Sequence, residues 1–163
     1  MSQSTTEQSL RDHVLYVLRG EGAHITLDAF VADFPVARCG ERVEGLPYTA
    51  WQVLEHMRIA LWDILEFTRN PKHVSPEFPS GYWPKTQVPP DAKAWDKSVH
   101  AFRADAKALA DLVADDSTDL LARLPHGDGQ TVLREALVAA DHNAYHLGEL
   151  VLVRRLLGAW SAS

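Results

Sequence analysis

Two histidines four residues apart are the first side chains that could share a chemical task. His142 and His146 lie in the segment DHNAYH, residues 141–146. On an α-helix this spacing puts both imidazoles on one face, about 6 Å apart along the axis, so both can point at one metal ion. Eight histidines among 163 residues would give roughly 0.4 such pairs by chance. Taken alone, the pair fits metal ligands and ordinary histidines equally well.

The surroundings of this pair favour a buried metal site. On a helical wheel the pair shares an apolar stripe with Val138, Ala139, Leu150 and Val153. Buried imidazoles need partners, and two that face one interior gap are satisfied together by a metal ion or a ligand. His56 lies in the middle of another apolar segment and can supply a third nitrogen from a facing helix. Three histidine ligands with open positions are typical of catalytic metal sites.

Two carboxylates could complete the chemistry of this site. Glu149 follows His146 by three residues, and four roles fit it: a fourth ligand, a base acting on metal-bound water, a hydrogen-bond acceptor for a ligand histidine, or an exposed charge at the rim. Asp63 is about two helical turns from His56, too far to orient its ring but placed to line the same cavity. We expect Glu149 and Asp63 to be the acidic groups of the active site.

Other reactive patterns fit the sequence less well. Asn143 follows His142, where the metalloprotease motif H-E-x-x-H has Glu. The di-iron bundle pattern, Glu-x-x-His on each of two helices, is also absent. Cys39 lies in a loop-like stretch with nothing beside it to lower the pKa of its thiol. Of the remaining histidines, three are expected at the surface and two could approach the mouth of the bundle: His73, His100 and His126 in the first group, His13 and His24 in the second.

Helical periodicity predicts the elements that must position these residues. Four long helices are expected, starting near Ser4, Thr49, Asp91 and Thr131 and ending near Gly20, Asn70, Val113 and Leu157. A short helical turn is expected over residues 26–31 and another over 120–124. No segment alternates as a half-buried strand does. The sequence therefore predicts an all-α four-helix bundle in a single domain over residues 1–163.

The segment of residues 71–90 interrupts this helical pattern. It contains six of the nine prolines together with Phe78, Tyr82 and Trp83. We expect a rigid loop whose aromatic side chains pack against the bundle or line a pocket. Tyr82 and Trp83 are the candidates for contact with a substrate.

Composition restricts the partners and the compartment. Hydrophobic residues make up 46% and charged residues 23% of the chain, the net charge is −6, and no Lys/Arg run could follow a phosphate backbone. No uncharged apolar run reaches the roughly 18 residues of a membrane span. Residues 1–12 lack the pattern of a secretion signal, and a lone cysteine suits a reducing compartment. We therefore expect a cytoplasmic protein that binds neither nucleic acid nor membranes.

Several motifs together resemble the DinB-like family, also called YfiT-like, of metal-dependent enzymes. They cover almost the whole chain: WQVLEH (51–56), WDILEF (62–67), YWP (82–84), LREAL (133–137) and DHNAYHLG (141–148). The resemblance implies a four-helix bundle of the up-down-down-up kind, with His56, His142 and His146 as the metal ligands. Understood members of the family include transferases and isomerases that use low-molecular-weight thiols. Glu149 departs from the pattern, because many relatives have Gln there.

Three functions remain open at this point. The leading hypothesis is a metal-dependent enzyme in which a divalent ion (Ni, Zn, Fe or Mn) activates water or a thiol for a small-molecule substrate, as a hydrolase or a thiol S-transferase. The others are a non-catalytic metal or small-molecule binding protein and a helical interaction module. Because the last helix is apolar on two sides, we also expect a homodimer, unless the loop of residues 71–90 covers the second side.

Overall fold

The computed structural model describes residues 2–160 of the chain, and their regular structure is helical. Five α-helices follow one another: α1 Ser2–Leu18, α2 Leu27–Ala32, α3 Ala50–Arg69, α4 Ala94–Ala114 and α5 Val132–Leu156. Two short 3₁₀ turns, η1 Val36–Arg38 and η2 Ser80–Tyr82, lie in the connections. Within residues 2–160 no strand forms, and Arg123 and Thr131 make an isolated antiparallel bridge. The prediction of an all-α fold with four long helices is confirmed.

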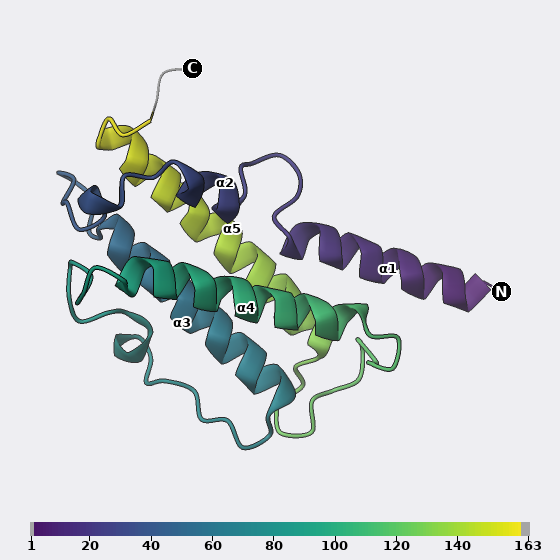
Figure 1. The fold of residues 1–163 in the computed structure, drawn as a ribbon. Coiled ribbons are helices and arrows are strands. Elements are labelled where there is room, and N and C mark those ends of the chain that lie inside the picture. Colours follow the sequence, from purple (N-terminus) through teal and green to yellow (C-terminus); the bar gives the residue numbers. More distant parts are fainter. Residues whose placement is uncertain (1, 161–163) are drawn as a thin grey trace.

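Figure 1 shows the arrangement of the four long helices. Their buried apolar side chains form two clusters. Helix α3 packs mainly against α4 and α5, and α1 packs against the same two helices. The larger cluster is centred on α3 and includes Leu54, Met57, Leu61 and Leu150. The smaller one lies beneath α1 and includes Val14, Val113 and Val132. Burial of these side chains provides most of the driving force that fixes α3 beside α5.

Side-chain caps set the starting points of the two helices that carry the candidate ligands. At the start of α3, Thr49 Oγ1 accepts the Gln52 N–H and the Gln52 side chain accepts the Thr49 N–H, as the sequence predicts. At the start of α5, Thr131 Oγ1 accepts the Arg134 N–H. These caps fix which residues of each helix face the partner helix.

Three expectations about helix boundaries need correction. Helix α1 begins at Ser2, two residues earlier than expected. The cap residue of α4 is Lys93, because Asp91 instead accepts the Lys93 N–H from a position before the helix. The stretch 120–124 is not helical, since the Leu124 N–H donates to the Gln130 carbonyl beside the isolated bridge.

No helix in the described part of the chain is long and apolar enough to cross a bilayer.

Candidate metal centre

Three histidine side chains meet between α3 and α5. His56 Nε2 lies 3.0 Å from His146 Nε2 and 3.1 Å from His142 Nε2. One ring nitrogen from each residue lies within 4.8 Å of the others, and we call this group the three-histidine cluster. His56 and His146 are buried and His142 is half-buried. The i, i+4 pair of α5 and the single histidine of α3 therefore converge as their spacing predicts.

Hydrogen bonds at the far side of two rings determine where their protons lie. His56 Nδ1 is 2.8 Å from the Tyr82 carbonyl oxygen, which can only accept, so Nδ1 carries the proton. His146 Nδ1 donates to Glu149 Oε2 at 2.7 Å. In the neutral imidazoles, both Nε2 atoms are then bare acceptors that face each other at 3.0 Å. Such a contact is repulsive unless a cation lies between the nitrogens.

The cluster has the chemistry and dimensions that a divalent ion requires. Metal–nitrogen bonds are about 2.0–2.1 Å long, so nitrogens about 3 Å apart can share one ion. Burial lowers the pKa of His142 to about 4, and the neighbouring His146 and His56 contribute in the same direction. Burial also lowers the pKa of His56 below its usual value. Both imidazoles are therefore neutral near pH 7, which is the form that binds metal ions.

Asp63 supports the cluster indirectly, through the loop that follows α3. Its carboxylate accepts hydrogen bonds from the Tyr82 hydroxyl at 2.6 Å and from His73 Nε2 at 2.7 Å. Burial and the contact with Asp63 raise the pKa of Tyr82 to about 12, so its hydroxyl keeps the proton that it donates. Asp63 does not belong to the group of described residues that could hold an ion. It fixes Tyr82, and the Tyr82 carbonyl in turn orients His56.

Aromatic rings cover the cluster on two sides. The Trp83 ring stacks on His56 with centroids 4.0 Å apart and planes 1° from parallel, and Tyr48 stacks on the other face of Trp83 at 3.8 Å. Tyr145 lies edge-on to His146, with centroids 4.9 Å apart, and is 66% exposed. The loop of residues 71–90 thus packs Tyr82 and Trp83 against the bundle, one of the two arrangements expected for it, whereas Phe78 is 84% exposed.

Glu149 is placed on the side of His146 that faces away from the cluster. Its Oε2 accepts the His146 Nδ1–H, and the carboxylate is not among the groups that converge with the three Nε2 atoms. Of the four roles considered for it, this position corresponds to an acceptor that orients a ligand histidine. The Glu149 side chain is 34% exposed, so solvent reaches this side of the cluster.

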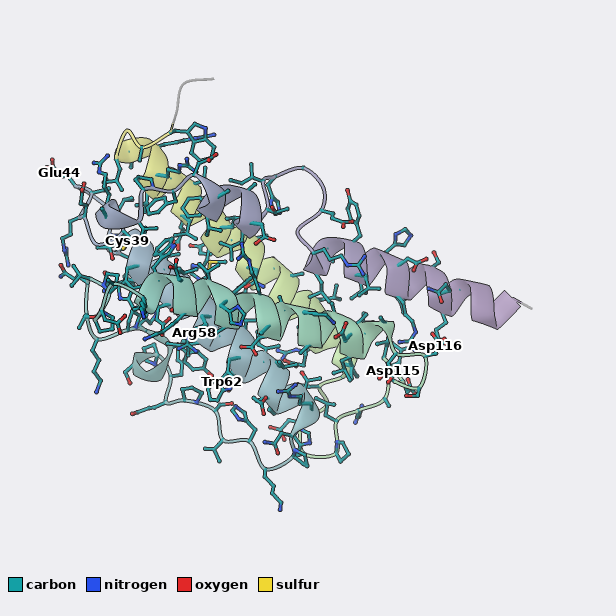
Figure 2. All side chains as sticks on the ribbon, in the orientation of Figure 1. Cys39, Glu44, Arg58, Trp62, Asp115 and Asp116 are labelled. Carbon is teal, nitrogen blue, oxygen red and sulfur yellow. The ribbon has the colours of Figure 1, made fainter. Side chains whose placement is uncertain are left out.

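The remaining candidates lie away from the cluster. His73 and His126 were expected at the surface but are half-buried, because His73 bonds to Asp63 and His126 Nε2 donates to the Phe67 carbonyl. Neither contact has a signal in the local sequence, since both depend on the paths of long loops. Cys39 is buried beside the start of α3 (Figure 2), and burial raises the pKa of its thiol. His13, His24 and His100 are exposed and lie outside the cluster.

Comparison with known proteins places these features in a family. The family model described as the DinB superfamily matches residues 12–150, a range that includes α3, α4, most of α5 and all three histidines. No curated protein and no solved structure matches the chain. Because the family match covers most of the chain, this protein belongs to the DinB superfamily.

Proposed function

We propose that the protein is a metal-dependent enzyme that binds one divalent ion on His56, His142 and His146. The observation that carries this proposal is the pair of bare Nε2 atoms of His56 and His146, 3.0 Å apart. In the neutral imidazoles both atoms are acceptors, because the other ring nitrogen donates its hydrogen to the Tyr82 carbonyl or to Glu149. A divalent ion turns this repulsive contact into two favourable bonds.

The incomplete ligand set supports a catalytic rather than a purely structural ion. Within the described residues, no other His, Cys, Asp or Glu joins the three histidines. Structural zinc sites normally have four protein ligands, whereas catalytic sites have three and leave a position for water or substrate. A bound divalent ion lowers the pKa of water to about 7 or deprotonates a thiol. We therefore favour hydrolysis or thiol transfer on a small-molecule substrate.

The protein's own groups hold the imidazoles in place for this chemistry. The Tyr82 carbonyl and Glu149 each fix the orientation and the tautomer of one ligand histidine. Trp83 excludes water from one face of His56, and Asp63 keeps Tyr82 in position. Three neutral imidazoles suit Ni, Zn, Fe and Mn, so the choice among these ions depends on which of them the cell supplies.

Metal analysis of untagged protein tests the binding part of this proposal. We expect about one divalent ion per chain, and a melting temperature that falls on chelation and recovers when metal is added back. His142→Ala should abolish both effects, whereas His100→Ala, which changes an exposed histidine, should preserve them. Absence of metal in the purified protein, together with no thermal shift on adding any of the four ions, would contradict the proposal.

A reaction panel tests the catalytic part. The metal-loaded protein should turn over at least one substrate among thiol–electrophile pairs and simple esters, and His142→Ala should lose that turnover. A protein that binds metal tightly and turns over none of them would instead be a non-catalytic metal or small-molecule binding protein.

A further inference from the structure

One side of α5 exposes more apolar surface than the other long helices do. Leu137, Tyr145, Leu152 and Leu156 are between 45% and 66% exposed. They follow one another at helical spacing on the side of α5 that faces away from the core residues Ala139, Leu150 and Val153. The loop of residues 71–90 packs over His56 and Asp63 instead. Several exposed apolar side chains along one face of a helix are typical of an interface.

Gly148 lies at the middle of this exposed side. It is exposed, and a Cβ atom built on it would meet no atom within 4 Å. Packing within the chain therefore does not require glycine here, although glycine weakens a helix relative to alanine. A glycine in a helix face allows a second helix to approach closely, because the distance between packed helices depends on the side chains at the contact.

The residues on either side of Gly148 form a self-complementary pattern. Asp141 lies seven residues before Gly148 and Arg155 seven residues after it, and Ala144 and Leu152 lie four residues before and after. If two α5 helices cross antiparallel at Gly148, each residue lies level with its counterpart from the other copy. Asp141 then lies level with the partner's Arg155, and the large Leu152 lies level with the partner's small Ala144.

The charges of this pattern are free to pair between copies. Asp141 and Arg155 are both exposed, and neither forms an ion pair within residues 2–160. In a dimer with two-fold symmetry the pair of Asp141 and the partner's Arg155 occurs twice, because the same surface of both copies forms the contact. Opposite charges at matched positions set the register, and the apolar residues between them supply the buried area.

We propose that the protein forms a homodimer through antiparallel α5 helices that cross at Gly148. The occupant of the exposed face is a second copy of this chain, since the pattern of charge and size is complementary to itself. This contact is independent of metal binding and of the reaction proposed above.

The solution mass of full-length protein gives the first test. Light scattering at tens of micromolar should give twice the chain mass of 18.1 kDa. Gly148→Leu should yield a folded monomer, because leucine favours the helix but blocks close approach. The control Ala104→Leu adds the same side chain at an exposed position of α4 and should remain dimeric. A monomeric wild-type protein, or a Gly148→Leu variant that is still dimeric, would overturn the proposal and leave this face to another partner.

Charge exchange provides the second and more specific test. Asp141→Arg and Arg155→Asp should each weaken the dimer about tenfold or more, because each puts like charges opposite one another twice. An equimolar mixture of the two variants should form a heterodimer, since every pair then has opposite charges again. Circular dichroism checks that both variants are folded. If the mixture associates no better than its components, the antiparallel register is wrong.

Discussion

Arg11 and the three-histidine cluster both bury polar nitrogen atoms, but they do so with opposite hydrogen-bonding patterns. Arg11, on α1, is 2% exposed, and its guanidinium donates to the carbonyls of Val113, Asp115 and Thr118 at 2.7, 3.1 and 2.6 Å. Every contact joins a donor to an acceptor and closes the C-terminal end of α4. In the cluster, the Nε2 atoms of His56 and His146 face each other, and in the neutral rings both are acceptors.

The difference separates polar groups that complete the fold from groups whose hydrogen-bonding pattern suits a bound ion. Arg154, on α5, follows the pattern of Arg11: it is buried and donates to the carbonyls of Phe30, Asp33 and Ala159. Both arginines tie distant segments together and need nothing from solution. Burial of a charged or polar side chain is therefore no sign of a binding site by itself. The sign is a set of buried atoms whose hydrogen-bonding capacity is matched only when another species is added.

The largest effect that follows from this contrast is the loss of metal from His142→Ala. Removing one of three ligands should lower metal affinity by at least about a thousandfold, or about 4 kcal/mol. The metal-free protein should keep its stability within about 1–2 kcal/mol, because His142 is half-buried, its Nδ1 has no hydrogen-bond partner within residues 2–160 and its Nε2 contacts His56 Nε2. Isothermal titration and urea unfolding measure the two quantities. A change in affinity of less than tenfold would show that His142 is not a ligand.

Arg11→Met should produce the reverse pattern. Three carbonyl groups lose their donor, so the free energy of unfolding should fall by about 3–5 kcal/mol. The folded variant should bind metal as the wild-type protein does. The control Arg103→Met removes an exposed ion pair with Asp28 and should cost less than about 1 kcal/mol. If Arg11→Met and Arg103→Met lose equal amounts of unfolding free energy, the buried hydrogen bonds of Arg11 contribute no more to stability than an exposed ion pair does.

Asp63 forms hydrogen bonds that stabilise the fold and also supports the three-histidine cluster. Asp63→Ala should therefore lower both the free energy of unfolding and the metal affinity moderately. The hydroxyl of Tyr82 and the ring of His73 lose their acceptor, which should cost about 2 kcal/mol of stability. Because the Tyr82 carbonyl is then less firmly placed on His56, metal affinity should fall about tenfold. Tyr82→Phe removes the hydroxyl and keeps the carbonyl, so it should lose less stability and less metal affinity than Asp63→Ala does. Unchanged metal affinity in Asp63→Ala would limit Asp63 to holding the loop.

The smallest effects are expected at Glu149. Glu149→Ala removes the acceptor for the His146 Nδ1–H and should lower metal affinity about tenfold. Glu149→Gln keeps a carbonyl oxygen that can accept the same hydrogen bond, so its loss should be smaller. Comparative titration with one metal ion measures this ordering. If Glu149→Gln binds as weakly as His142→Ala, the carboxylate is itself a ligand.

The sequence was sufficient to predict the helices and the meeting of the three histidines. The i, i+4 spacing of His142 and His146 places both rings on the same face of a helix. The Thr49–Gln52 capping box marks the start of α3. His56 could be assigned because it lies on the apolar face of α3, which must pack against the rest of the bundle. The apolar periodicity of the long helices and the cap at Thr49 depend only on nearby residues, so the folded structure keeps them, whereas the cap expected at Asp91 did not form.

The contacts that support the cluster could not be predicted in this way. Asp63 was expected to line the cavity, and its hydrogen bonds to Tyr82 and His73 could not be foreseen, because the positions of both partners depend on the path of an irregular loop. Arg11 is a charged residue within a helical pattern and would be read as exposed, yet α4 ends where its carbonyls meet the guanidinium. Such contacts depend on how distant segments meet, and no local spacing encodes this.

The stacking of Trp83 on His56 gives the protein an intrinsic optical reporter. The two rings are parallel with centroids 4.0 Å apart, so the excited indole lies against an imidazole that we propose to be a ligand. An ion with a partly filled d shell, such as Ni²⁺, quenches a nearby indole by energy or electron transfer, whereas closed-shell Zn²⁺ does not. The chain has five tryptophans, so the part of the total emission that Ni²⁺ quenches and Zn²⁺ does not would report the contribution of Trp83 in unlabelled protein and in real time.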